Sequence, residues 1–192
     1  MTDTPTTDAA TTAVPMPAAP AAPRPATPAD LFARLDRLGI PYTTYEHPPL
    51  FTVEDSKRLR GDLPGGHCKN LFLRDKKRSL FLLVTLEDRR IDLKSLRHVL
   101  GAAGNLSFGD PALLMQALGV EPGAVTPFAL VNDAGRRVAV YLDRDMLARD
   151  PLNYHPLSNR LTTAIAPGDL VRFIESCGHV PRTVDLGQAS GA

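Results

Sequence analysis

The chain has 192 residues, 43% of them hydrophobic, and a formal net charge of only +1. This length suits one compact domain plus a tail, and no apolar run approaches the roughly 20 residues of a membrane-spanning helix. The near-neutral charge argues against the broad basic face of a general DNA- or RNA-binding protein, so any nucleic-acid contact should be small and local. Cys68 and Cys177 lie too far apart for a metal-binding motif, which predicts a reduced, cytoplasmic protein without a metal site.

Residues 1–28 consist almost entirely of Ala, Thr and Pro. The segment has neither the basic start and apolar core of a secretory signal nor the arginines of a transit peptide. We therefore expect a disordered, partly polyproline-like tail over 1–28 and one folded domain over 29–188.

A helix is expected directly after this tail. Thr27 can cap it, Pro28 suits its first position, and Asp30 complements the positive end of the helix dipole. Gly39 ends the helix. A strand over 41–46, a turn over 47–49, a short helix over 54–59 and a loop over 61–66 follow.

The rest of the chain predicts two hairpins mixed with single helices. Expected strands at 70–74 and 80–86 flank a turn, and 128–131 and 138–142 form a second hairpin around 132–135. Helices are expected over 92–100, 111–118 and 167–176, and strands over 161–165 and 182–186. This order predicts an α+β fold: a curled, mixed but largely antiparallel sheet or barrel, with helices packed outside it.

A lysine enters an apolar, strand-like run at Cys68-Lys69-Asn70-Leu71-Phe72-Leu73. The commoner interpretation of such a lysine is that its stem lies on apolar surface while the ammonium reaches solvent. The functional interpretation is that its point charge binds a phosphate or a developing oxyanion.

About fifty residues later, a glycine and a proline bracket three small residues in Gly123-Ala124-Val125-Thr126-Pro127. Taken alone, this is a loop like many others. A stretch of this kind can form a stiff loop whose backbone groups approach a ligand closely, because glycine has no side chain to block the approach.

Together the two segments resemble the freestanding prolyl-tRNA editing proteins of the YbaK/ProX superfamily. The resemblance covers roughly residues 30–186. It is greatest to the alanine-editing branch (ProXp-ala, PrdX-like) at residues 91–94, 106–109, 123–127 and 153–157. It implies the curled α+β editing fold and an aminoacyl-tRNA deacylase that removes alanine from mischarged tRNA(Pro) by water attack, with no metal or cofactor. The implied partner is the tRNA acceptor end, with prolyl-tRNA synthetase as a second candidate and neither membrane nor DNA.

The resemblance also implies site residues. Lys69 would be the catalytic residue, holding the phosphate of the terminal adenosine. The implied substrate-binding residues are Asn70, Ser107, Gly123, Thr126, Pro127, His155, Asn159 and His47. Without the resemblance, structural roles explain His47 equally well, and a lone histidine such as His155 is more often a packed or surface residue.

Two other functions stay open from the sequence. A related deacylase could clear cysteine, serine or threonine, because pocket volume rather than motif decides the substrate. A noncatalytic module could instead grip the acceptor end or a synthetase. A deacylation assay separates all three.

Overall fold

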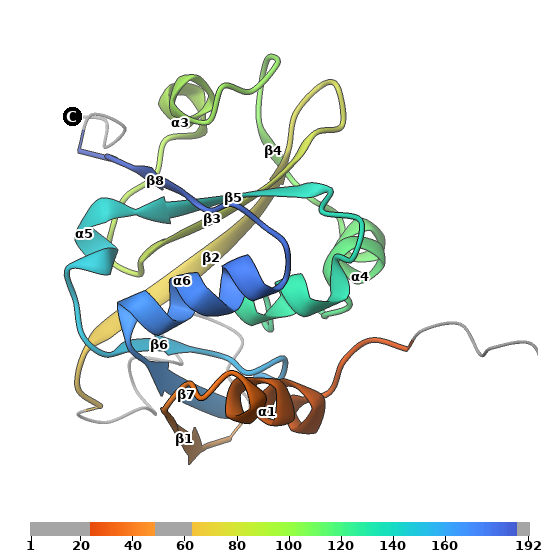
Figure 1. The fold of residues 1–192 in the computed structure, drawn as a ribbon. Helices are drawn as coiled ribbons and strands as arrows, with labels where there is room; N and C mark the ends of the chain where they lie inside the picture. Colours follow the sequence, from red (N-terminus) through yellow and green to blue (C-terminus); the bar gives the residue numbers. More distant parts are fainter. Residues whose placement is uncertain (1–23, 49–62, 188–192) are drawn as a thin grey trace, which may run out of the picture.

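The computed structural model describes residues 24–48 and 63–187, which form one mixed sheet with helices around it (Figure 1). The elements are α1 (Pro28–Arg37), β1 (Tyr42–Glu46), β2 (Gly66–Arg74), β3 (Leu80–Leu86), α3 (Leu93–Val99), β4 (Ser107–Phe108), α4 (Pro111–Leu118), the 3₁₀ helix η1 (Pro127–Asn132), β5 (Val138–Asp143), α5 (Arg144–Leu147), β6 (Leu152–Tyr154), β7 (Leu161–Ile165), α6 (Pro167–Ser176) and β8 (Arg182–Val184). The expected helix over 54–59 and much of the loop over 61–66 lie outside the described residues.

The strand order is β1-β7-β6-β2-β3-β5-β8, with β4 also paired to β2. Four pairings are antiparallel and three, β2 with β6, β3 with β5 and β5 with β8, are parallel. Among the described residues β1 and β8 do not pair with each other, so the sheet stays open. The α+β class with a mixed sheet and surrounding helices is confirmed.

Strand β2 is the centre of the sheet, and one of its edges is only partly used. β3 pairs along residues 68–74 on one edge. On the other edge β6 pairs only with Gly66 and His67, and β4 only with Leu73 and Arg74. Residues 68–72 thus have no strand partner on that edge within the described part of the chain, which leaves room for a loop.

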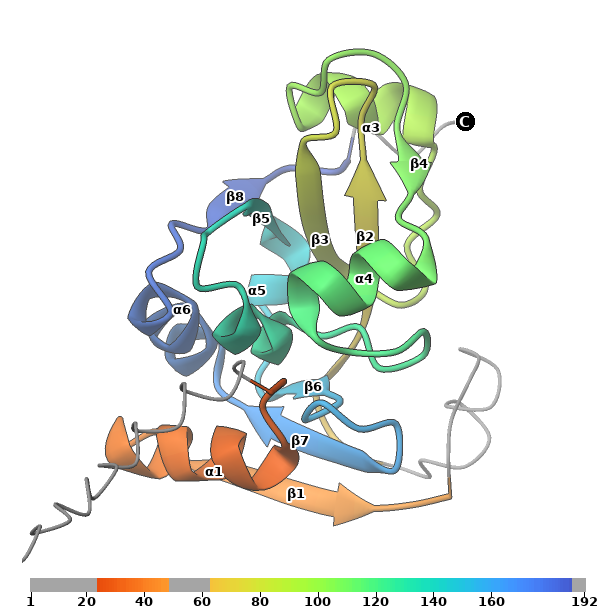
Figure 2. The same cartoon turned by 90° about the vertical axis from the view of Figure 1, so that its right-hand side faces the viewer.

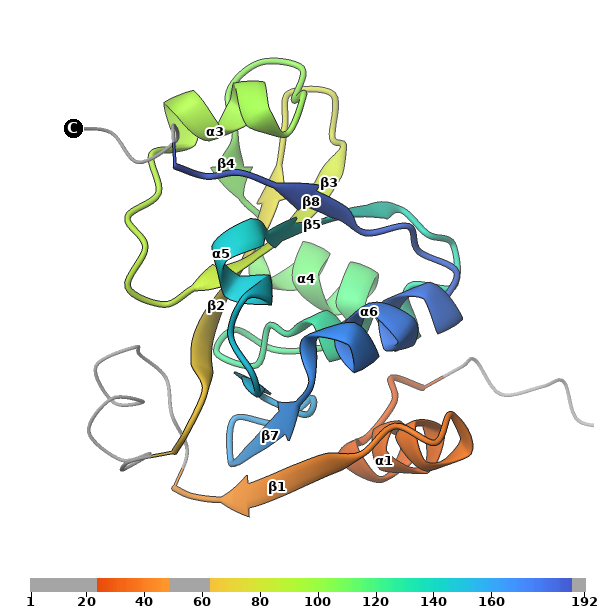
Figure 3. The ribbon, with the colours of Figure 1, turned by 60° about the vertical axis from the view of Figure 1, so that its left-hand side comes forward.

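Alternation along β2 and β3 divides the core into two clusters, since successive side chains of a strand point to opposite faces. Phe72, Leu82 and Val84 pack with α1, α4, η1 and α6. Leu73, Phe81 and Leu83 pack with α3 and with Leu106 and Tyr141. Figure 2 shows α3 at one end of the molecule and α1 with β1 at the opposite end, and Figure 3 shows α6 between β8 and α1.

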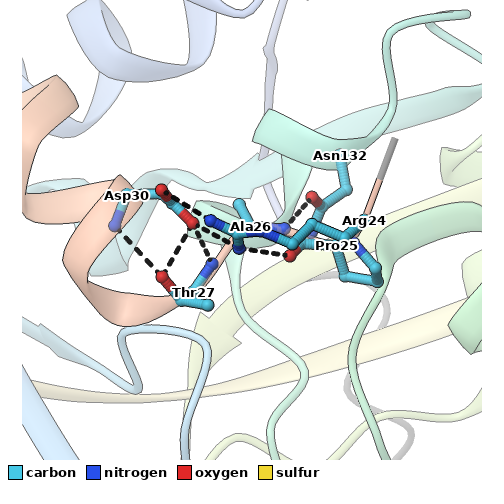
Figure 4. Close-up of polar contacts among 6 residues, drawn as sticks. All are labelled: Arg24, Pro25, Ala26, Thr27, Asp30 and Asn132. Carbon is cyan, nitrogen blue, oxygen red and sulfur yellow. Dashed lines mark hydrogen bonds and ion pairs between the residues drawn. The ribbon is translucent and has the colours of Figure 1, made fainter. Parts of the chain in front are cut away.

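The first helix forms as the sequence predicts. Thr27 and Asp30 make a reciprocal capping box, with Thr27 Oγ1 accepting from the Asp30 N–H and the Asp30 carboxylate accepting from the Thr27 N–H. Arg24 adds an ion pair to Asp30 at 2.9 Å, and the Ala26 N–H donates to Asn132 Oδ1 at 2.8 Å (Figure 4). Residues 24–27, which the domain division assigned to the tail, therefore contact the folded body, while residues 1–23 lie outside the described residues.

The predicted second hairpin is wrong. Residues 128–131 belong to η1, and β5 pairs in parallel with β3 rather than with them. Thr126 caps η1 through the Phe128 N–H, and Pro127 occupies its first turn, where a missing N–H costs nothing. Phe128, Ala129 and Leu130 are all buried. Because an unbroken apolar run has no periodicity, its sequence does not show whether it forms a strand or a short buried helix.

The remaining differences concern short elements. The β2–β3 hairpin, α3 with its Asp92 cap, α4, β7, α6 and β8 all form where they are predicted. Strand β2 begins four residues earlier than predicted, at Gly66, and α5 and β6 were not anticipated. No helix among the described residues is long and apolar enough to cross a membrane.

Candidate active site

Strand β2, which contains Lys69, meets the loop from Gly123 to Pro127 at the part of its edge that has no strand partner among the described residues. Asn70 Nδ2 donates to the Val125 carbonyl at 2.9 Å. Gly123 has a φ of +89°, a conformation that favours glycine, and Thr126 and Pro127 are buried at the start of η1. The loop is thus fixed by η1 at one end and held against β2 by Asn70.

Lys69 lies one residue away and on the other face of the strand. By strand alternation it shares the face of Leu73, whereas Asn70 shares the face of Phe72. Its ammonium donates to the Arg89 carbonyl, and its cross-strand neighbour is Thr85. The structure therefore brings the loop to Asn70 rather than to Lys69.

A buried carboxylate organises the surroundings of Lys69. Asp143, at the end of β5, is fully buried and accepts a hydrogen bond from Thr85 Oγ1 at 2.7 Å. Arg89 Nε lies 2.9 Å from the same carboxylate, and the Arg89 guanidinium also pairs with Asp145. The Arg89 carbonyl accepts the hydrogen bond from the Lys69 ammonium. The ion pairs of the Arg89 side chain with Asp143 and Asp145 therefore hold in place the residue that binds Lys69.

A small, partly open cavity lies on the Asn70 side. Its volume is about 40 Å³, close to the space of one water molecule or one ammonium group. The lining residues are Leu63, His67, Cys68, Asn70, Glu87, Asn153, Tyr154, His155 and Thr162. Polar side chains from β2, β6 and β7, together with Glu87 directly after β3, thus converge on this cavity.

His155 presents a hydrogen-bond acceptor at this cavity. Its Nδ1 lies 2.8 Å from the Leu161 carbonyl, which can only accept, so Nδ1 carries the proton. Burial lowers the pKa of His155, the nearby His47 lowers it further, and the Leu161 bond offsets part of the effect. The ring is therefore neutral at neutral pH, with the lone pair on Nε2.

The same argument assigns the other two histidines near the cavity. His47 Nδ1 donates to the Pro48 carbonyl at 2.8 Å, and its Nε2 lies 2.9 Å from Thr162 Oγ1. His67 Nε2 donates to the Leu63 carbonyl at 3.0 Å, which leaves Nδ1 as an acceptor in the neutral ring. The rings of His47 and His155 are 5.9 Å apart, so the structure brings these two predicted residues together.

Two predicted residues lie elsewhere. Ser107 is exposed on β4, opposite Arg74 and roughly 16 Å along β2 from Lys69 at the usual rise per residue. Asn159 lines a different, larger groove of about 450 Å³ between residues 25–28, the end of α4 and the loop over 157–159. Neither belongs to the cavity beside Asn70.

Comparison with known proteins now identifies the family. Residues 47–173 match the family model described as the aminoacyl-tRNA editing domain. The chain belongs to the aminoacyl-tRNA editing family.

Curated relatives within this editing family cover most of the chain. Prolyl-tRNA synthetase associated domain-containing protein 1 of Danio rerio is 41% identical over 160 residues, which are 80% of this chain and 86% of the relative. The prolyl-tRNA editing protein ProX of Acetoanaerobium sticklandii is 34% identical over 157 residues, 81% of this chain and 95% of the relative. A crystal structure of a candidate trans-editing enzyme for prolyl tRNA synthetase has a TM-score of 0.63 at 21% identity, covering 84% of this chain and 99% of that one. The last similarity shows the YbaK/ProX-type fold.

Sequence reasoning missed Glu87 in this editing domain. Glu87 is buried, follows β3 directly and lines the cavity. The available signal was an acidic residue at the end of an apolar strand. Cys68 lines the same cavity, and burial raises the pKa of its thiol to about 12, so it stays protonated.

No group of three His, Cys, Asp or Glu side chains suited to a metal ion occurs within residues 24–48 and 63–187.

Proposed function

We propose that this editing-domain protein hydrolyses the ester between alanine and tRNA(Pro). The observation that carries the proposal is the hydrogen bond from Asn70 to Val125, which sets the loop from Gly123 beside a cavity lined by Glu87 and His155. Membership of the editing family supports deacylation, and the name of the Acetoanaerobium sticklandii relative supports a prolyl-tRNA substrate.

The reaction needs one water molecule. Its oxygen bonds to the ester carbonyl carbon, the bond from that carbon to the ribose oxygen breaks, and the ribose oxygen takes up a proton. An aminoacyl ester is already activated, so orienting the water and stabilising the oxyanion provide most of the catalysis. The products are alanine and uncharged tRNA(Pro).

Three of the predicted residues have a direct role in this proposal. The Lys69 ammonium holds the phosphate of the terminal adenosine, and the ribose hydroxyl of the tRNA helps to activate the water. The lone pair on His155 Nε2 orients a water or a hydroxyl. Main-chain amides near Gly123, which is exposed and lacks a side chain, steady the ester carbonyl.

A separate editing site has a physical reason. A synthetase pocket built for proline discriminates against a smaller apolar amino acid by only about 1–3 kcal/mol, since few contacts are lost. A second site that admits alanine and excludes proline removes the errors. When this second site belongs to a separate chain, that chain must contact the tRNA acceptor end, and it can also contact prolyl-tRNA synthetase.

The deciding experiment is deacylation of Ala-tRNA(Pro), with Pro-tRNA(Pro), Cys-tRNA(Pro) and Ala-tRNA(Ala) in parallel. Release of alanine from tRNA(Pro), with Pro-tRNA(Pro) intact, is the expected result. Cleavage of Cys-tRNA(Pro) instead would indicate a related deacylase. Binding of tRNA without cleavage of any substrate would leave a noncatalytic module and end the enzyme proposal.

A further inference from the structure

Phe108, on the short strand β4, is exposed although it is aromatic. It is 60% exposed, and the other large hydrophobic residues left exposed in the described part of the chain, Met115 and Val180, are aliphatic. Burial of a phenylalanine side chain is normally favourable, yet neither of the two hydrophobic clusters takes up Phe108. Packing within the described residues therefore does not account for this ring.

The register of β4 fixes the face of the sheet on which Phe108 lies. Phe108 is paired with Leu73 of β2, and paired residues of neighbouring strands share a face. Leu73 in turn shares its face with Lys69. The next residue, Gly109, belongs to the other face, where an added Cβ would lie 2.4 Å from Phe72 Cδ1. Phe108 is therefore on the face of the sheet that carries Lys69.

The distance from Phe108 to Lys69 suits a short strand of RNA. Leu73, the partner of Phe108, lies about 13 Å along β2 from Lys69 at the usual rise per residue. Stacked nucleotides rise about 3.4 Å each, so about four of them cover this distance. Both β4 and the loop that Asn70 holds lie along the same edge of β2. A tRNA 3′ end that follows this edge away from Lys69 reaches Phe108 within that length.

Two basic side chains lie close to Phe108. Arg74 is paired with β4 in the sheet, and the side chain of Lys76 lies over Gly104 in the loop that leads to β4 (Figure 2). Within the described part of the chain neither of them forms an ion pair. Asp75, the acid between them, is buried and accepts hydrogen bonds from main-chain N–H groups. An exposed aromatic ring beside free cations is typical of surfaces that bind single-stranded nucleic acid.

We propose that Phe108 stacks on an unpaired base of the tRNA 3′ strand while Arg74 and Lys76 contact the neighbouring phosphates, an inference that rests on the proposed deacylase function. Every base has a π-face, so this contact adds affinity without selecting a sequence. It holds the strand at a second point besides Lys69 and thereby limits the positions of the ester. A surface of this size also suits a chain whose net charge is only +1.

The test measures binding of an uncharged hairpin RNA that copies the acceptor stem and unpaired 3′ end of tRNA(Pro). Fluorescence anisotropy gives the affinity, so the readout does not depend on catalysis. Phe108→Ala should bind about tenfold more weakly, the effect of losing one stacked base, and Phe108→Trp should bind at least as tightly as the unmutated protein. Val180→Ala, at another exposed hydrophobic residue, is the matched control and should leave the affinity unchanged. Thermal unfolding checks that the variants are folded.

A second RNA locates the effect without relying on a variant. This hairpin is abasic at every unpaired position except the terminal adenosine, so it keeps the phosphates and loses the bases. The unmutated protein should bind it about tenfold more weakly, and Phe108→Ala should then cause no further loss. Salt separates stacking from charge: Phe108→Ala should leave the slope of log affinity against log salt unchanged, whereas Arg74→Ala should lower it by about 0.7.

Unchanged affinity in Phe108→Ala, or an equal loss on both hairpins, overturns the inference. Weaker binding of prolyl-tRNA synthetase by Phe108→Ala, with RNA affinity unchanged, would assign the surface to a protein partner and overturn it as well. Deacylation of Ala-tRNA(Pro) by the unmutated protein is measured in parallel. Cleavage together with an unchanged Phe108→Ala affinity rejects the stacking contact alone, whereas absence of both RNA binding and cleavage rejects the proposed function too.

Discussion

The side-chain amide of Asn70 joins the two segments of the chain that carry the family resemblance. Its nitrogen donates to the Val125 carbonyl at 2.9 Å, beside the part of the β2 edge that has no strand partner among the described residues, and its oxygen faces the cavity without a hydrogen-bond partner there. One side chain therefore both holds the loop from Gly123 and contributes to the site that the loop borders.

Replacing Asn70 by Asp tests this double role. The carboxylate would face the Val125 carbonyl without a donor, so the loop should detach and the deacylation rate should fall at least about tenfold, for a cost of about 1–3 kcal/mol at that contact. Asn105→Asp, at an exposed asparagine, is the control. An unchanged rate in Asn70→Asp would show that the loop contact is dispensable.

Lys69 is tested through its charge. Lys69→Ala should lose most of the activity with little change in unfolding temperature, and should lower the slope of log affinity against log salt by about 0.7–0.9 if one phosphate contact is lost. Lys77→Ala, on the exposed tip of the β2–β3 hairpin, should leave the catalytic rate unaltered.

Lys69→Arg refines the test. The larger planar group keeps the charge but takes more space beside Arg89, so we expect tRNA affinity to be partly retained while turnover falls. Wild-type turnover in both Lys69 variants would rule out a catalytic role for this residue.

The sequence alone predicts an element correctly where a residue acts on its immediate neighbours along the chain. Thr27 caps α1, Asp92 caps α3, and Pro111 occupies the first position of α4, because the start of a helix depends on a few neighbouring residues. The run from Phe128 was misassigned because burial on several sides removes the periodicity that separates a strand from a helix.

The site was less accessible to sequence reasoning, because it depends on pairings between distant segments. Glu87, Asn153 and Thr162 reach one cavity only through the pairing of β2 with both β3 and β6 and of β6 with β7. Ser107 matched a family segment, yet its strand pairs near the far end of β2. Nothing in the spacing of these residues along the chain indicates which of them meet.

Asp143→Asn tests whether the buried carboxylate acts through Arg89 on Lys69. The amide keeps the shape but loses the charge that faces Arg89, so we expect a loss of about 1–3 kcal/mol in unfolding free energy, since Asp145 still pairs with the guanidinium. We also expect faster acetylation of Lys69 by an amine-reactive ester, measured by mass spectrometry. Arg144→Ala, which removes only an exposed ion pair to Asp185, is the control. Destabilisation with unchanged Lys69 reactivity would make Asp143 purely structural.

The lowered pKa of His155 predicts how stability and activity depend on pH. The ring of His155 has a pKa of about 6.5 in the unfolded state and a lower pKa in the folded state. As pH falls, the unfolded state therefore takes up the proton first. The contribution of His155 to the free energy of unfolding is complete above the pKa of the unfolded state, and it is lost as pH falls through the pKa of the folded state. Protonation also removes the lone pair on Nε2, so the deacylation rate should fall over the same range. His155→Asn should flatten the acid side of both profiles, measured by urea unfolding and by single-turnover deacylation, whereas His98→Asn, at an exposed histidine of α3, should flatten neither. An acid limb that survives in His155→Asn would assign it to another group.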